Sequence, residues 1–97
     1  MNKLKALEII AQHADEIRSR FGAEALWLFG SVARDEAGEK SDVDILAQFE
    51  GAATFRRFMG LRFYLEDVLG NRVDLVTRQA LRPQMRSAIE QEAIRAA

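Results

Sequence analysis

The sequence contains no cysteine and only one histidine, one proline and one tryptophan in 97 residues. Without cysteine, disulfide bonds and thiolate metal sites are excluded. We see no signal peptide and no apolar run long enough to cross a membrane, so we expect a cytoplasmic protein with no membrane partner. The only histidine, His13, falls off the apolar stripe of its predicted helix. We therefore expect a solvated side chain there and assign it no role.

The chain also lacks an excess of positive charge, since 14 Lys and Arg residues face 15 Asp and Glu residues, for a net charge of -1. Proteins that bind nucleic acid usually carry a basic excess that attracts phosphates. The balance argues against a polymerase or an RNA-tailing enzyme, and we expect no direct nucleic-acid partner. A content of 48% hydrophobic and 30% charged residues is typical of a globular protein, and the length predicts a single domain over residues 1–97.

The stretch between Ala25 and Glu50 contains the residues that point to a function. It begins with a short run of bulky apolar residues, 25–29, which predicts a buried strand. Gly30 and Ser31 follow directly, and glycine lets backbone amides approach an anion closely. If a helical turn begins at Ser31, its free amides add to the attraction for a phosphate. This end of the strand is therefore predicted to bind phosphate.

Two aspartates stand at the start of the returning strand, which we predict over residues 41–49. Asp42 and Asp44 lie two residues apart, so on an extended strand both carboxylates leave the same face. Their charges raise each other's pKa unless a cation neutralises them. Magnesium, a hard ion that prefers oxygen ligands, suits such a pair. The pattern predicts a metal–nucleotide site.

The spacing of these motifs resembles a known signature. Gly30-Ser31, ten further residues and then Asp42-x-Asp44 look like the signature of the nucleotidyltransferase superfamily with the polymerase-beta-like fold. More narrowly, residues 29–34 and 41–46 are similar to the minimal nucleotidyltransferases, which include MntA-type antitoxins paired with HEPN-domain toxins. The resemblance implies an α/β (α+β) fold with a small mixed sheet and helices packed mainly on one side. It also implies two Mg²⁺ ions and transfer of AMP from ATP to a hydroxyl, with tyrosine the expected acceptor, on a HEPN-family ribonuclease toxin.

A third aspartate, Asp74, lies in the middle of a short strand predicted over residues 72–77. It points to the face opposite Val73 and Leu75. An aspartate inside a strand is unfavourable unless solvent, a donor or a metal meets it. Asp74 matches the third carboxylate of the superfamily, so the resemblance implies a metal ligand that also accepts the acceptor's proton. The alternative is an exposed aspartate on an edge strand.

The remaining roles follow from the same resemblance. Asp42 and Asp44 are expected to bridge the two metal ions, while Gly30 and Ser31 hold the β- and γ-phosphates. Arg34 either pairs with the triphosphate or forms a structural salt bridge to Asp35, Glu36 or a metal-site carboxylate. In many family members a glycine follows this arginine. Asp35 stands there in this sequence, so the loop is expected to differ in geometry.

Three long helices are predicted around these strands. Residues 3–21 form one helix with Asn2 as its N-cap and Gly22 as its stop. Its expected apolar stripe comprises Leu4, Leu7, Ile10, Ala11, Ala14, Ile17 and Phe21. A final helix runs through residues 81–97, with Pro83 near its start, and is expected to pack on the sheet or cover its open side.

The central helix is predicted from an N-cap at Thr54 to a stop at Gly70. Its expected inner side comprises Phe55, Phe58, Met59, Arg62, Leu65, Val68 and Leu69. The aromatic residues beside Arg56, Arg57 and Arg62 have two interpretations. A stacking surface for nucleic acid or a purine is one, and core packing with a basic outer face is the one we favour. A protein partner that covers Phe63 or Tyr64 is a third interpretation.

So short a chain must borrow a substrate-binding surface from a partner or from a second copy of itself, so a homo-oligomer is one interpretation. Two other functions stay open. The first alternative is a small-molecule nucleotidyltransferase subunit, as in antibiotic-modifying relatives. The second is a non-catalytic module that neutralises its partner by contact alone. Three clustered acids favour catalysis, because contact alone does not require them.

Overall fold

The computed structural model describes residues 1–38 and 40–97. Glu39, in the polar loop expected between Ser31 and Lys40, lies outside the described residues. The described chain forms one four-stranded sheet in the order β3-β2-β1-β4. Its strands are β1 (Ala23–Phe29), β2 (Val43–Phe49), β3 (Val73–Thr77) and β4 (Ile94–Arg95). β1 pairs antiparallel with β2 and β4, and β2 pairs parallel with β3, so the predicted mixed sheet is confirmed.

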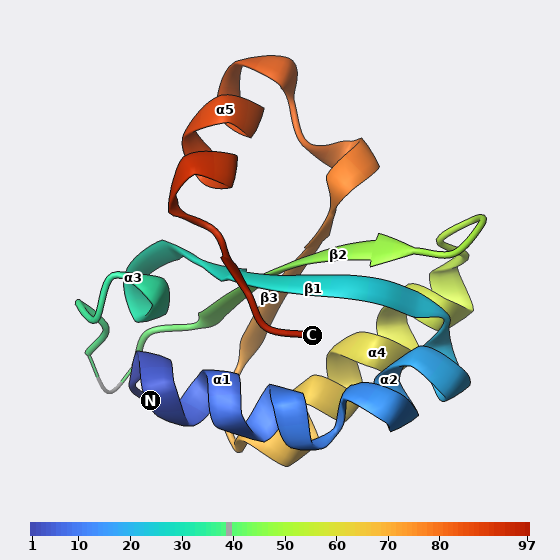
Figure 1. Cartoon of the computed structure of the whole chain (residues 1–97), viewed down its shortest axis with the longest axis horizontal. Coiled ribbons are helices and arrows are strands. Elements are labelled where there is room, and N and C mark those ends of the chain that lie inside the picture. Colours follow the sequence, from blue (N-terminus) through green and yellow to red (C-terminus); the bar gives the residue numbers. More distant parts are fainter. Residues whose placement is uncertain (39) are drawn as a thin grey trace.

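The long helices gather on one face of this sheet (Figure 1). They are α1 (Lys3–Gln12), α2 (Ala14–Phe21) and α4 (Phe55–Leu69). A single helical turn, α3 (Gly30–Ala33), follows β1. The 3-10 turn η1 (Arg78–Ala80) and helix α5 (Pro83–Glu92) lie beyond the other side of the strands in Figure 1. The fold class expected from the sequence is therefore confirmed. None of the helices in the described residues is long and apolar enough to span a membrane.

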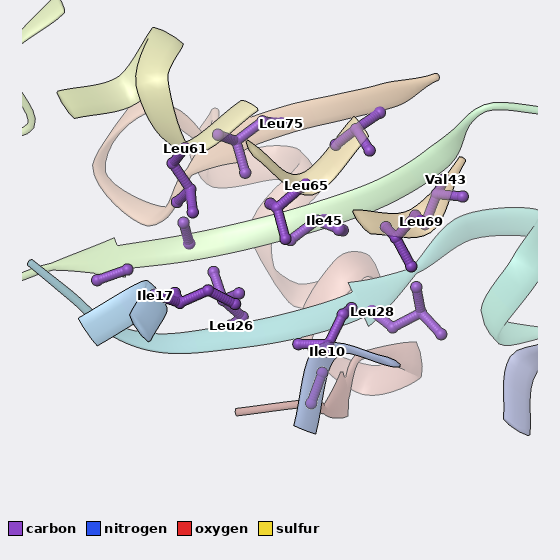
Figure 2. Close-up of a cluster of buried hydrophobic side chains, with 14 of the residues drawn as sticks. Ile10, Ile17, Leu26, Leu28, Val43, Ile45, Leu61, Leu65, Leu69 and Leu75 are labelled. Atoms are coloured by element: carbon purple, nitrogen blue, oxygen red, sulfur yellow. The ribbon is translucent and has the colours of Figure 1, made fainter. Parts of the chain in front are cut away.

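The core lies between the strands and the three long helices (Figure 2). Alternate residues of each strand face it, because successive side chains of a strand point to opposite sides. Burying one leucine or isoleucine contributes about 1.5–3 kcal/mol, so this layer accounts for much of the stability. The largest fully buried side chains of this core are Ile10, Ile17, Leu26, Leu28, Ile45, Leu61, Leu65, Val32 and Val43. Leu46 is also buried, but it lies on the opposite face of the sheet, the face of Asp44.

The prediction of a single helix over residues 3–21 is wrong, because the chain breaks at His13. Its backbone N–H donates to the Ile10 carbonyl (3.1 Å), and its Nδ1 lies 2.8 Å from the Ile9 carbonyl. The ring is half-buried and meets Tyr64 edge-on, so the expected solvated side chain is also wrong. The break gives each helix its own inward face, and Leu4 is 75% exposed while Ala6 is buried. The Asn2 cap and the left-handed stop at Gly22 are both confirmed.

Both ends of α4 are as predicted. The Thr54 side chain accepts the Arg57 N–H (3.2 Å), and Gly70 is left-handed. The inner side is rotated from the predicted one, because the row Leu61, Leu65 and Leu69 faces the sheet and Phe55 is 80% exposed. Leucines spaced four apart lie above one another on a helix, and this row outweighs the aromatic residues on which the prediction relied.

Arg57 ties three segments together and does not contribute to a free basic face. Its guanidinium donates to the carbonyls of Phe21 (2.9 Å), Gly22 (3.1 Å), Glu50 (2.9 Å) and Ala52 (2.7 Å). These bonds join the end of α2 to the loop before α4, so Arg57 is a structural residue. This removes Arg57 from the predicted basic outer face and equally from a stacking surface for nucleic acid.

Phe63 and Tyr64, further along α4, lie in two different environments. The Tyr64 hydroxyl donates to Glu16 (2.8 Å), and its ring packs on Phe21, so Tyr64 serves the fold. Phe63 is 59% exposed, and the interpretation that a partner covers it remains a prediction.

The last predicted helix ends early. α5 stops at Glu92, Ala93 is extended, and β4 adds to the edge of β1 with Ile94 opposite Leu28. The Ala96 N–H donates to the Leu26 carbonyl (2.8 Å), which continues the ladder. Eight of the ten α5 residues are exposed, so the alternative in which this helix packs on the sheet is wrong. α5 does lie on the open side of the sheet, opposite the long helices, which agrees with the other alternative (Figure 1). The unpaired edge of β1 offers backbone hydrogen bonds that a helical C-terminus does not use.

Candidate active site

Two of the predicted aspartates lie side by side on neighbouring strands. Asp44 and Asp74 are partners in the parallel register of β2 and β3. Neighbouring strands lie about 4.8 Å apart, so side chains in register on one face are close. Val43, Ile45, Val73 and Leu75 are all buried toward the helices, which places both carboxylates on the opposite face. Asp44 is half-buried and Asp74 is exposed.

The carboxyl of Asp44 is in an unfavourable setting for a negative charge. Burial, and then the charges of Asp74 and Asp42, raise its pKa from 3.8 to about 6, with Arg34 acting in the opposite direction. Repulsion among three carboxylates is the physical signature of a site that accepts a cation. Oxygen-only donors are those that Mg²⁺ prefers, so the donor chemistry fits this ion.

Asp42 precedes β2 and is held aside. Its Oδ1 accepts a hydrogen bond from Arg72 Nε (3.1 Å), and both side chains are substantially exposed. Among residues 1–38 and 40–97, no three acidic or histidine side chains are already gathered closely enough to hold a metal ion together. The structure thus brings Asp44 and Asp74 together and leaves Asp42 next to them with a different partner. A three-carboxylate ligand set requires the Asp42 carboxylate to move closer to the other two.

Gly30 lies directly against the Asp44 carboxylate. Phe29 is opposite Asp44 in the antiparallel register, and the backbone turns at the next residue. Gly30 has φ +73°, and a β-carbon there would lie 2.0 Å from Asp44 Oδ2. Both the left-handed backbone and the lack of space require glycine. Ser31 follows in α3 and is half-buried. The short helical turn predicted after β1 is confirmed, although four residues add little dipole.

Arg34, at the end of α3, forms two salt bridges. Its Nε donates to Glu36 Oε2 (3.0 Å), and its Nη1 donates to Glu92 Oε2 (2.9 Å). Glu36 first, and then Glu92, raise the pKa of the guanidinium above its ordinary value. Glu36 is one of the salt-bridge partners considered from the sequence. The other oxygen of Glu92, Oε1, accepts the backbone N–H of Gly30 (3.0 Å).

Glu92 is the residue of this site that the sequence analysis missed. It lies 58 residues from Arg34 along the chain, so no local pattern connects the two. One signal was present: Glu90 and Glu92 end a helix, where the dipole disfavours negative charge by about 0.3–1 kcal/mol. Each has a guanidinium partner, Arg78 for Glu90 (3.3 Å) and Arg34 for Glu92. Acids in that position indicate a compensating contact but do not identify it.

Asp35, which stands where the resemblance led us to expect glycine, has a left-handed backbone conformation. It is the non-glycine residue with positive φ (56°) among the described residues. Its Oδ1 accepts the Lys3 backbone N–H (3.0 Å), which links the turn after α3 to the start of α1. Aspartate tolerates the left-handed region better than most residues. Residue 35 therefore keeps a conformation that glycine also adopts, and its side chain adds a link to α1, while the expected difference in loop geometry from family members stays a prediction.

Trp27 lies on the same face of the sheet as Asp44, two residues along β1 from Phe29. The guanidinium carbons of Arg78 and Arg95 lie 5.6 and 5.5 Å from its ring centroid. Such cation–π contacts give a half-buried tryptophan a structural role. Trp27 alternates along β1 with the buried residues Leu26 and Leu28, and we assign it no part in a reaction.

Known proteins resemble this chain over nearly its whole length. Residues 10–96 match the family described as nucleotidyltransferase domain. Protein adenylyltransferase MntA from Thermococcus cleftensis is 42% identical over 86 residues, which are 89% of this chain and 87% of the relative. A protein of Methanocaldococcus jannaschii that carries the name of a protein adenylyltransferase is 36% identical over 88 residues, 90% of each chain.

Solved structures give the same picture of the fold. One described as a minimal nucleotidyltransferase has a TM-score of 0.82 and 39% identity, and the match covers 97% of this chain and 95% of that one. A complex of a tri-AMPylated Shewanella oneidensis HEPN toxin with an MNT antitoxin has a TM-score of 0.67, with 94% of this chain and 71% of that chain covered. At 15% identity, this second likeness concerns the fold alone.

Proposed function

The chain belongs to the nucleotidyltransferase domain family, and on that premise we propose that it is a magnesium-dependent adenylyltransferase that neutralises a partner toxin. The observation that carries the proposal is the pair of carboxylates on Asp44 and Asp74 beside the backbone of Gly30. The name of the Thermococcus cleftensis relative, protein adenylyltransferase MntA, supports AMP as the transferred group and a protein as the acceptor. The HEPN-family ribonuclease toxin as partner follows from the resemblance of the motifs.

Asp42, Asp44 and Asp74 would hold two Mg²⁺ ions. Bound there, magnesium would neutralise the triphosphate and lower the pKa of the acceptor hydroxyl. Asp44 must be ionised to serve, and its raised pKa of about 6 means that it binds a cation and a proton in competition. Asp42 completes the set when its carboxylate turns from Arg72 toward Asp44.

The phosphates would lie on the α3 side of the carboxylates. The Gly30 N–H donates to a phosphate oxygen, and Ser31 adds its hydroxyl and backbone N–H. Arg34 contributes a forked set of donors that matches phosphate geometry. These three residues hold the β- and γ-phosphates and steady pyrophosphate as it leaves.

The acceptor would approach from the β3 side, where Asp74 is exposed on an edge strand. That position is open to a residue carried by another protein, so a large acceptor fits. The acceptor oxygen of a tyrosine attacks the α-phosphorus of ATP while Asp74 accepts its proton. The bond from the α-phosphorus to the bridging oxygen breaks, pyrophosphate leaves, and AMP stays on the tyrosine. The site residues offer no covalent nucleophile, so transfer is direct.

Mass spectrometry tests the proposal. A candidate HEPN-family toxin from the same organism is incubated with this chain, Mg²⁺ and each nucleoside triphosphate in turn. We expect the partner to gain one or more AMP units on tyrosine with ATP, and no gain with the Asp44→Asn variant. Asp67→Asn, an exposed aspartate of α4, is the matched control and should modify the partner normally. A stable complex that shows no modification with any nucleotide would overturn adenylyl transfer in favour of neutralisation by contact.

A further inference from the structure

The carboxylate of Glu92 occupies the donors that the proposed function gives to a phosphate. Its Oε1 accepts the Gly30 N–H (3.0 Å), and its Oε2 accepts Arg34 Nη1 (2.9 Å). A carboxylate and a phosphate both present anionic acceptor oxygens to such donors. The Gly30 amide has a single hydrogen, so it cannot serve Glu92 and a phosphate with full strength at the same time.

We propose that Glu92 is a latch: it closes the phosphate site when no nucleotide is bound, and a nucleoside triphosphate opens the site by displacing it. The proposal rests on the proposed function, because it takes Gly30 and Arg34 as phosphate ligands. It adds a regulatory contact inside the same chain, supplied by the last turn of α5.

The helix that carries the latch is lightly attached. Within α5 only Ile89 and Glu92 are half-buried, while the other eight residues are exposed. The segments on either side are better anchored, since Leu81 and Ala96 are buried and β4 pairs with β1. Segments that bury few apolar side chains open at low cost. α5 can therefore shift while the sheet, and with it Asp44, stays in place.

Charge favours the exchange. Glu92 offers one negative charge and sits at a helix C-terminus, where the dipole repels it. A triphosphate brings several charges and no such penalty, so it competes well for Gly30 and Arg34. An anion with one charge gains much less, so the latch favours polyphosphates over simple anions. A latch that leaves the site open a tenth of the time weakens apparent affinity about tenfold.

The test is an isothermal titration calorimetry experiment in which the full chain is titrated with inorganic tripolyphosphate and, separately, with ATP. Glu92→Gln keeps the shape of the side chain and removes the charge that pairs with Arg34. We expect its Kd for both ligands to be about tenfold lower than that of the wild type. Glu90→Gln is the matched control: it makes the same change on the same helix, but its partner is Arg78, so its Kd should match the wild type.

Hydrogen–deuterium exchange of the wild-type chain gives a second readout that needs no variant. We expect the amides of residues 86–92 to exchange faster once tripolyphosphate is bound, because the last turn of α5 has been released. Protection that stays constant or increases on binding would overturn the latch.

The outcomes separate the latch from the proposed function. If Glu92→Gln binds no more tightly, or if it loses turnover at unchanged affinity, then Glu92 positions Arg34 and the latch is wrong. In that case a wild-type chain that binds ATP and transfers AMP keeps the proposed function intact. If neither the wild type nor Glu92→Gln binds ATP or tripolyphosphate, both proposals fail together.

Discussion

Gly30 and Asp44 are in such close contact that a β-carbon on residue 30 would lie 2.0 Å from Asp44 Oδ2. The end of β1, where the turn α3 begins, and the strand that carries the carboxylate therefore meet without a side chain between them. This contact joins the two halves of the sequence motif, which are separated by ten residues along the chain. Under the proposed function, this contact would bring the Gly30 amide next to a phosphate bound beside Asp44.

Gly30→Ala is predicted to lose AMP transfer and stability together. The left-handed backbone at residue 30 costs alanine about 1–2 kcal/mol, and the new methyl group also displaces the Asp44 carboxylate. Gly51→Ala is the control, because Gly51 is left-handed (φ +72°) but a β-carbon there meets nothing within 4 Å. In denaturant unfolding, both variants should lose the stability that a left-handed alanine costs. In transfer assays, only Gly30→Ala should lose activity. Equal activity in both variants would contradict the contact.

The contribution of Asp44 to the stability of the metal-free protein is predicted to fall as pH rises from about 4 to about 6. Asp44 holds its proton more tightly in the folded chain, with a pKa of about 6 against 3.8, so ionisation above that range destabilises the fold. Asp44→Asn should therefore be more stable than the wild type at neutral pH in a chelator, with the difference vanishing below about pH 4. Mg²⁺ should stabilise the wild type and have little effect on Asp44→Asn. Thermal unfolding across pH checks this, with Asp67→Asn as control. A difference in stability between Asp44→Asn and the wild type that does not change with pH would contradict the prediction.

Asp35→Gly and Asp35→Ala are predicted to differ in stability. Both lose the hydrogen bond to the Lys3 N–H, but only alanine keeps the cost of a left-handed residue. Alanine should be less stable than glycine by about 1 kcal/mol in denaturant unfolding. If the two variants unfold at the same denaturant concentration, residue 35 does not hold a left-handed backbone in solution.

Arg57→Lys is predicted to lower the free energy of unfolding by about 2–3 kcal/mol. An ammonium group carries its three donors on one atom and cannot span the four carbonyls that Arg57 joins. Arg56→Lys, at the exposed neighbouring position, is the control and should change stability by less than about 0.5 kcal/mol. Activity should survive in both variants well below the melting temperature, because neither arginine lies near the carboxylates. Equal stability of the two variants would show that Arg57 is a surface residue.

The sequence by itself determined the elements that depend on local chemistry. A buried apolar run predicts β1, the Thr54 cap and Gly70 stop predict α4, and alternation places Asp74 on the face away from the core. The candidate carboxylates Asp42 and Asp44 were found in the same way, because their spacing is a local property of the sequence, although only Asp44 lies within β2. These signals act over a few residues, so a chain of any fold would display them.

Only the tertiary structure decided the contacts between distant segments. The break at His13, the addition of β4 to β1, the pairing of Asp42 with Arg72 and the position of Glu92 all depend on groups far apart in the chain. An unpaired strand edge, a helix end with two acids and a crowded carboxylate each require a partner, but their local sequence does not say which one. That choice is made when the whole chain packs, because the partner must also fit the shape of the core.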